Sequence, residues 1–205
     1  MPRMTAHAVP PSSTAPSPSG ASIPAQPLHR PHLMRVVVMG VSGCGKSTMA
    51  RSLAQALGWR YIEGDQHHSA ANIQKMSAGT PLNDDDRAGW LHTLSGLIAQ
   101  AAQAQEGLVL TCSALKRKYR DVLRQGDAEL LFLHLQGSKA VIAPRMNVRT
   151  GHYMPPSLLD SQLRDLEMPQ ADERILPLDV AQAPEQLLQQ ALQHLSLLSK
   201  PSASS

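Results

Sequence analysis

The chain has 205 residues, which is enough for one domain of ordinary size with a tail. Hydrophobic residues make up 42% and charged residues 17%, so the composition allows a buried core and excludes a globally disordered chain. The formal net charge of +3 sits in no dense block of Lys and Arg, which argues against a nucleic-acid partner.

The cysteines and the apolar runs indicate the cellular compartment in which we expect the protein. Cys44 and Cys112 belong to no CxxC pair, which argues against a disulfide or a zinc site and favours a reducing cytosol. No apolar run approaches the roughly 18 residues of a membrane helix, and the N-terminus lacks the apolar core of a signal peptide. We therefore expect a cytoplasmic protein with no membrane partner.

Both ends of the chain have the composition of tails. Residues 1–31 are rich in Pro, Ser and Ala and cannot bury enough apolar surface to fold, so we predict a disordered N-terminal segment. An organelle transit peptide and a later start near Met34 are alternative explanations of this segment. We place the folded domain at 32–199 and expect residues 200–205 to be a disordered end.

Between the tails, strand-like and helix-like patterns alternate. A β-branched run predicts a strand at 33–39 that is buried on both faces, and the helix that follows it ends at Gly58. Further strands are predicted at 59–65, 107–112, 129–135 and 174–180, and further helices near 69–76, 84–103, 116–124, 139–149, 156–166 and 188–198. Pro177 interrupts the ladder of the last strand. The alternation predicts an α/β fold of three layers, with a five-stranded parallel sheet and helices on both faces.

The sequence GVSGCGKS, residues 40–47, follows the first strand directly and opens the next helix. It matches the phosphate-binding pattern G-x-x-x-x-G-K-[ST], in which glycines let backbone N–H groups turn toward phosphate oxygens. We expect Lys46 to reach the β- and γ-phosphates of ATP and the Ser47 hydroxyl to bind Mg²⁺. The predicted ATP-binding residues are Gly40, Val41, Ser42, Gly43, Cys44, Gly45, Lys46, Ser47 and Thr48.

The absence of several sequence motifs excludes some classes of P-loop protein. The strand GLVLTC ends without the Asp that many nucleotide hydrolases use for magnesium, and the nearest acid at a strand end is Asp65. The chain contains no N-K-x-D sequence, so guanine recognition of the GTPase kind is unsupported. It is also too short for the extra strands and insertions of many motor ATPases. A small-molecule kinase remains.

Four blocks make the chain resemble the gluconokinase family: GVSGCGKS, EGDQHHSAANIQKMSAGTPLNDDDRAGWL, CSALKRKYRDVLR and GHYMPPSLLDSQLRDLE. They occur in the order typical of that family, and the resemblance covers about residues 33–198. It implies a P-loop fold of the nucleoside-monophosphate-kinase type, a homodimer, and conversion of D-gluconate and ATP to 6-phosphogluconate and ADP. The N-terminal tail is extra, and Glu63-Gly64-Asp65 stands where Asp-Gly-Asp is also common in the family.

Asp65 lies at the end of a strand that we expect to neighbour the strand before the phosphate loop. Open α/β sheets bind ligands at this edge. We predict that Asp65 acts on the acceptor hydroxyl, as general base or as orienting group, and that it also helps to hold magnesium through a water. The alternative is a turn residue or a helix cap after Gly64.

Two segments after Asp65 supply further candidates for substrate binding. We expect His68 to hydrogen-bond the polyol, and Asn72 and Lys75 share one helix face that could reach the same pocket. A solvated Lys75 is the alternative. The resemblance implies that Asp84 and Arg87 lie near the substrate, where an Arg fork clamps a carboxylate, with Trp90 packed beneath them. A simpler explanation of the acidic run is that Asn83 or Asp84 caps the helix.

The block after the third strand supplies the last candidates. Ser113, Lys116 and Arg120 follow that strand at the ligand edge, and the two cations lie four residues apart, a basic pair suited to a carboxylate or a phosphate. We expect Tyr119 to serve packing. The other cations of this block are expected to be solvated, namely Arg117, Lys118 and Arg124.

The segment near 145–156 resembles the mobile lid of such kinases. We predict Arg145 and Arg149 to be catalytic, approaching the γ-phosphate when the lid closes and excludes water. Residues 179–184 fall where this fold usually meets adenine. Two alternatives stay open: a shikimate- or nucleotide-type kinase on the same fold, and a nucleotide-binding regulatory module without catalysis. The chain has no adjacent glycine pair of the kind expected at a shikimate site.

Overall fold

The computed structural model describes residues 33–147 and 156–198. The strands are β1 (Arg35–Met39), β2 (Arg60–Glu63), β3 (Leu108–Thr111), β4 (Leu131–Gln136) and β5 (Ile175–Asp179). The helices are α1 (Lys46–Leu57), the short 3-10 helix η1 (Gly64–His67), α2 (Ala70–Ser77), α3 (Asp84–Gln103), α4 (Arg117–Arg124), α5 (Lys139–Asn147), α6 (Pro156–Asp165) and α7 (Pro184–Leu198). Within the described residues, every predicted strand and helix is present, with ends that differ by a few residues.

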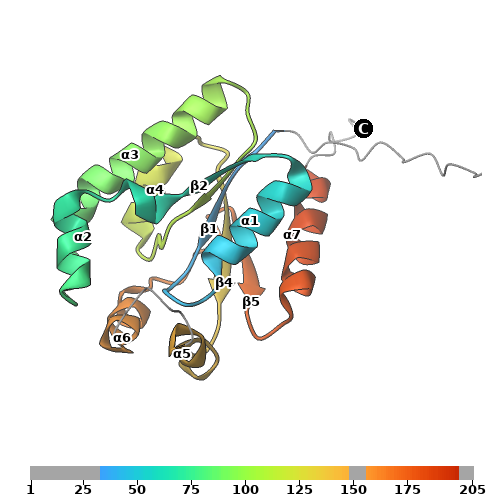
Figure 1. Cartoon of the computed structure of the whole chain (residues 1–205). Coiled ribbons are helices and arrows are strands. Elements are labelled where there is room, and N and C mark those ends of the chain that lie inside the picture. Colours follow the sequence, from blue (N-terminus) through green and yellow to red (C-terminus); the bar gives the residue numbers. More distant parts are fainter. Residues whose placement is uncertain (1–32, 148–155, 199–205) are drawn as a thin grey trace, which may run out of the picture.

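The sheet is parallel throughout, and its strand order is β2-β3-β1-β4-β5. Helices α1 and α7 lie on one face, and α3 and α4 lie on the other (Figure 1). This arrangement confirms the predicted three-layer α/β fold. Pro177 is tolerated in β5 because that strand lies at an edge of the sheet.

One prediction about strand order is wrong. We expected the strand before Asp65 to neighbour the phosphate-loop strand, but β2 pairs with β3, and β3 pairs with β1. The burial of the strands gives the reason. β2 carries Arg60 and Glu63, which suit an edge, whereas β3 is buried along its whole length and fills the middle of the sheet.

The core has two parts, one on each face of the sheet. Val36 and Val38 of β1 pack with α1 and α7, whereas Val37 and Met39 pack with α3 and α4. All four side chains are completely buried, as predicted for a strand covered on both faces. Among the described helices, none is long and apolar enough to cross a membrane.

Two glycines allow segments at the carboxyl ends of the strands to pack closely against one another. Gly40 has φ 137°, and a Cβ there would lie 2.5 Å from the Leu135 carbonyl oxygen. A Cβ on Gly64 would collide with the Thr111 carbonyl oxygen. Because neither position tolerates a side chain, the phosphate loop packs against β4, and the residues that follow β2 pack against the end of β3.

Candidate active site

The phosphate loop lies between β1 and α1, as its sequence pattern requires. Gly45 precedes the helix in the left-handed conformation, with φ 98°, and Lys46 begins α1. The Lys46 Nζ donates to the Val41 carbonyl oxygen at 3.1 Å, so the ammonium group is folded back over its own loop. A phosphate oxygen that replaced this carbonyl would receive the same charge-assisted hydrogen bond.

Glu63, the last residue of β2, is the acid that the loop faces. Tyr61 donates its hydroxyl hydrogen to Glu63 Oε2 at 2.5 Å, and the Thr111 hydroxyl donates to Oε1. Burial alone would raise the pKa of Glu63. Hydrogen bonds from Thr111, Tyr61 and Ser47, together with the charge of Lys46, outweigh burial and lower the pKa. Glu63 is therefore an ionised carboxylate next to the loop's Ser47.

Glu63 was assigned no role from the sequence. It was noted only as a departure from a family pattern, and magnesium was assigned to Ser47 and Asp65. The signal was present, because Glu63 ends a strand and stands in register with Thr111 at the end of β3. An acid at this place stands at the edge where a parallel sheet binds its ligands.

Asp65 lies two residues after Glu63, in η1, and is exposed. Burial raises the pKa of the Cys112 thiol to about 12, and the charges of Asp65, Lys46 and Arg87 all act on that thiol. Cys112 follows β3 and is completely buried. The three charged side chains come from three separate segments of the chain, and all lie near enough to Cys112, just after β3, to affect the pKa of its thiol.

His68 and Trp90 form the floor beneath η1. Their rings stack with centroids 4.0 Å apart, and the Trp90 Nε1 donates to the Gly64 carbonyl oxygen at 2.8 Å. Burial lowers the pKa of His68, and its Nδ1 has no hydrogen-bond partner among the described residues. The stacking accounts for His68 as packing, and the unpaired Nδ1 leaves the predicted hydrogen bond to a polyol untested.

Asn72 and Lys75 connect α2 to α3. The Asn72 Nδ2 donates to the Asp86 backbone carbonyl at 2.6 Å, and the Lys75 Nζ lies 2.5 Å from Asp86 Oδ1. Asp86 also forms a reciprocal capping box with Asn83, which starts α3. A contact of Asn72 or Lys75 with substrate would therefore require an exchange of partners.

Asp84 holds α4 against the start of α3. Its carboxylate accepts hydrogen bonds from Lys116 at 3.0 Å and Lys118 at 2.5 Å, and from the Tyr119 hydroxyl. These donors lower the pKa of Asp84 well below its usual range. Lys116 and Lys118 thus share the single negative charge of Asp84, and Lys118, expected to be a solvated charge, is paired although it is exposed. Ser113 contributes its carbonyl oxygen, which accepts from the Gly40 backbone N–H at 3.2 Å.

Arg120 contradicts its predicted role as a substrate ligand. Its side chain is completely buried and forms a two-pronged ion pair with Glu173, with Nε–Oε2 and Nη2–Oε1 distances of 2.6 and 2.9 Å. Lys116 precedes α4 and points to Asp84, so the two cations do not form a basic pair. Arg124, also expected to be solvated, reaches Glu173 at 3.2 Å.

Arg87 differs from the other predicted acceptor cations. Its Nη2 donates to the Leu82 carbonyl oxygen at 3.2 Å, and the guanidinium lies 5.8 Å from the centre of the Tyr119 ring. Among the described residues, Arg87 forms no ion pair, whereas Lys75, Lys116 and Arg120 all do. The positive charge of Arg87 is therefore not neutralised by a carboxylate of the described residues, and it can attract an anionic ligand.

Arg145 lies on the other side of the phosphate loop. A cavity of about 260 Å³ extends from the loop to the start of α7, and it is lined by Gly45, Thr48, Arg145, Gln182, Pro184 and Leu187. The Arg145 Nη2 donates to the Val180 carbonyl oxygen at 2.8 Å. This position is beside the segment expected to meet adenine, so the predicted approach to the γ-phosphate remains a prediction. Arg149 and most of the predicted lid lie outside the described residues.

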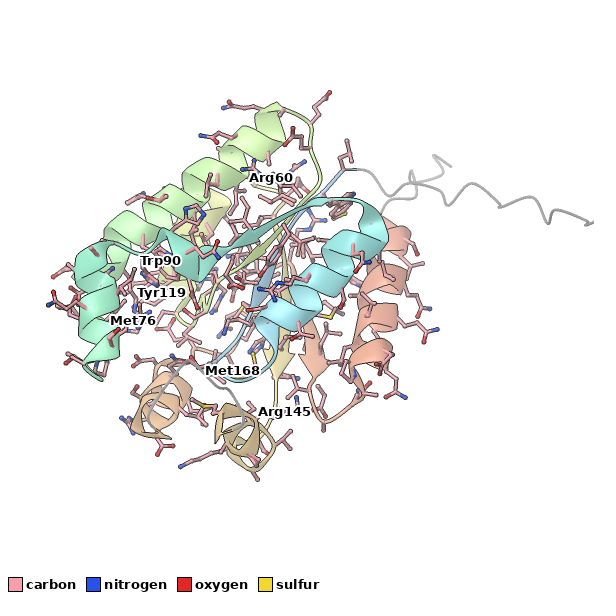
Figure 2. All side chains as sticks on the ribbon, in the orientation of Figure 1. Arg60, Met76, Trp90, Tyr119, Arg145 and Met168 are labelled. Atoms are coloured by element: carbon pink, nitrogen blue, oxygen red, sulfur yellow. The ribbon has the colours of Figure 1, made fainter. Side chains whose placement is uncertain are left out.

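The phosphate loop also contacts α6. The Gln162 Oε1 accepts from the Ser42 backbone N–H at 2.6 Å, and Nε2 donates to Ser42 Oγ at 3.1 Å. The sequence pattern assigned Gln162 no role. Figure 2 shows Arg145 on α5 and, across the molecule from it, Trp90 on α3 and Tyr119 on α4.

Comparisons with known proteins match most of the chain. A family model described as an AAA domain matches residues 36–169. A curated gluconokinase from Gluconobacter oxydans is 46% identical over 159 residues, covering 78% of this chain and 89% of the relative. A probable gluconokinase from Schizosaccharomyces pombe is 44% identical over 176 residues, covering 82% and 91%. The crystal structure of a gluconokinase from Sinorhizobium meliloti 1021 has 46% identity and a TM-score of 0.76, covering 83% of this chain and 95% of that one.

Proposed function

The chain belongs to the gluconokinase family, and we infer that it transfers a phosphoryl group from ATP to D-gluconate, giving 6-phospho-D-gluconate and ADP. The observation that carries this function is the phosphate loop, with Lys46 at the start of α1 and Glu63 beside its Ser47, together with Asp65 exposed just after β2. Phosphoryl transfer needs this combination, because a cation must bind the transferred group while a carboxylate meets the attacking hydroxyl.

The donor side of the reaction is assigned to the loop. Lys46 leaves the Val41 carbonyl and binds the β- and γ-phosphates, while the backbone N–H groups of residues 43–48 bind the remaining phosphate oxygens. The cavity beside Arg145 takes the base of the nucleotide. Arg149 is proposed to approach the γ-phosphate because it belongs to the segment that resembles a lid.

Magnesium is assigned to the Ser47 hydroxyl and the Glu63 carboxylate. Among residues 33–147 and 156–198, no three His, Cys, Asp or Glu side chains cluster as an all-protein metal site. The donor set fits magnesium nonetheless, since Mg²⁺ bound to phosphates needs only one or two protein oxygens. When bound, the ion neutralises charge that develops on the transferred group.

The acceptor side is assigned to Asp65 and Arg87. Asp65 accepts the proton of the attacking hydroxyl, and its exposure at the ligand edge lets a polyol reach it. Arg87 binds the gluconate carboxylate, because it is the predicted acceptor cation that forms no ion pair among the described residues. His68 is proposed to donate to or accept from a gluconate hydroxyl through its Nδ1. A homodimer is a further proposal that follows from the family resemblance, and a cytoplasmic location is one that follows from the two cysteines outside any CxxC pair.

The acceptor can be tested directly. ADP release is measured with gluconate, shikimate, glycerate and nucleoside monophosphates as separate acceptors. We expect gluconate-dependent turnover, which Lys46→Ala abolishes while leaving the unfolding temperature unchanged. Turnover with shikimate or a nucleotide instead would assign the chain to another acceptor, and a lack of turnover with all of them would favour a regulatory module.

A further inference from the structure

We propose that Gln162 is a positioning residue for the donor nucleotide: it holds the phosphate loop through Ser42 and so raises the affinity of the loop for ATP. The inference rests on the proposed use of ATP and does not depend on the identity of the acceptor. Gln162 itself is not assigned to contact either substrate.

The contact between α6 and the phosphate loop consists of two hydrogen bonds between Gln162 and Ser42. The Gln162 side chain uses its carbonyl oxygen for the Ser42 backbone N–H and its amide nitrogen for the Ser42 hydroxyl, at 2.6 and 3.1 Å. A primary amide carries an acceptor and a donor in one plane, so a single side chain fixes both groups of Ser42. Both hydrogen bonds are partly buried, which limits competition from water.

The part of the loop that Gln162 holds is intrinsically adaptable. Ser42 lies between Gly40 and Gly43, whose φ angles are 137° and 80°. Glycines at such positions leave a loop many conformations when nothing restrains it. On the β3 side, the Ser113 carbonyl accepts from the Gly40 N–H at 3.2 Å, so Gln162 supplies a second restraint from outside the loop. A loop that is already ordered loses less entropy when it binds phosphate.

Apolar packing beside this contact is incomplete. A cavity of about 350 Å³ lies next to it, lined by Val41 of the loop, by Leu163 and Leu166 from α6 and the residue after it, and by His134 and Ile142. His134 is buried there, and neither ring nitrogen has a hydrogen-bond partner among the described residues. Leu159 of α6 belongs to the same apolar cluster as Val41, and the two hydrogen bonds of Gln162 add a direct polar link between α6 and the loop.

The test measures nucleotide affinity without an acceptor. Gln162→Met keeps the length of the side chain and removes both hydrogen bonds. We expect the Kd of a non-hydrolysable ATP analogue to rise about tenfold, which corresponds to about 1.4 kcal/mol for two hydrogen bonds of ordinary strength. The KM for the acceptor should stay within experimental error, and the unfolding temperature should fall by only a few degrees, since the lost contact is confined to two partly buried hydrogen bonds. Gln100→Met, at an exposed position of α3, is the matched control and should change neither quantity.

A second variant separates positioning from a structural role. Ser42→Ala removes only the hydroxyl contact and leaves α6 intact, so we expect a Kd increase of about threefold. In the double variant, Ser42→Ala should add nothing to Gln162→Met, since the shared contact is already lost. Additive effects, equal increases in the acceptor KM and the nucleotide Kd, or a lower unfolding temperature with unchanged Kd would each overturn the proposal. A wild-type chain that binds the analogue but does not phosphorylate gluconate would refute the proposed function and leave this test decisive.

Discussion

Arg120 of α4 and Glu173, two residues before β5, form a fully buried ion pair, with side chains 0% and 1% exposed. The remaining nitrogen of Arg120, Nη1, donates to the backbone carbonyls of Ala114, Leu115 and Glu167. The pair therefore joins three segments: the turn after β3, the residues after α6 and the residues before β5. This single cluster anchors the elements that flank the ligand edge of the sheet.

Replacing Arg120 by Met should destabilise the protein strongly. The substitution removes the two-pronged partner of the buried Glu173 carboxylate and leaves it only Arg124 at 3.2 Å and the Gln170 backbone N–H, and breaking one side of a buried pair costs about 3–5 kcal/mol. Urea unfolding measures this loss. Arg117→Met is the control, because the Arg117–Asp172 pair is exposed and such pairs contribute about 1 kcal/mol or less. Equal losses in the two variants would show that the buried pair contributes no more than a surface one.

The same pair should make stability depend on pH. Burial alone would raise the pKa of Glu173, but the hydrogen bonds and charge of Arg120 outweigh it and lower the pKa from 4.5 to about 2. The stabilisation is fully present above the unfolded pKa, and it is lost as the pH falls from about 4.5 toward 2 because the unfolded state binds the proton first. Glu173→Gln should show a flatter loss of unfolding free energy over this window. An identical slope in both proteins would contradict the assignment.

The fold followed from local patterns to a large degree. The runs of β1, β3 and β4 are apolar on both faces, and residues such as Gly58 mark helix ends within a few positions. The strand order was less accessible, because the place of β2 depends on which strand is buried most completely in the middle of the sheet. The position of β2 in the sheet depends on a comparison of its burial with that of the other strands, so the sequence of β2 alone does not determine it.

The candidate site was predictable where its residues are adjacent in the sequence. The phosphate loop is one run of residues, so its spacing alone indicates a binding site. Arg120 was misassigned because its partner Glu173 is 53 residues away, and nothing near Arg120 in the sequence marks it as buried. The link from Gln162 to Ser42 spans 120 residues and was missed for the same reason.

Asp65→Asn should reduce kcat by at least roughly a hundredfold, the low end for the loss of acid–base catalysis. The amide keeps the size of the side chain but cannot accept the proton of the attacking hydroxyl. Steady-state kinetics with gluconate measure the effect. Asp85→Asn, at an exposed position in the first turn of α3, serves as the control. A change confined to KM would make Asp65 a substrate-binding residue only.

Glu63→Gln should selectively weaken the binding of magnesium, so that the enzyme requires a higher Mg²⁺ concentration. The Glu63 carboxylate is ionised and sits beside Ser47, and the amide lacks the charge that Mg²⁺ prefers. We expect the Mg²⁺ concentration for half-maximal activity to rise about tenfold, consistent with losing one charged interaction. The experiment is a Mg²⁺ titration at saturating ATP and gluconate. Glu106→Gln, exposed before β3, should behave as wild type, and an unchanged titration for Glu63→Gln would remove Glu63 from the metal site.

Arg87→Met should raise the KM for gluconate and leave the KM for ATP unchanged. Hydrogen bonds to a charged carboxylate contribute about 1.5–3 kcal/mol, so the expected increase is roughly ten- to a hundredfold. Arg87→Lys keeps the charge without the planar fork, and it should fall between wild type and Met. Lys75→Met is the matched control, since the Lys75 ammonium is already paired with Asp86. If Lys75→Met raised the KM for gluconate more than Arg87→Met, the carboxylate would be bound at α2, and the Lys75–Asp86 pair would have to open for substrate.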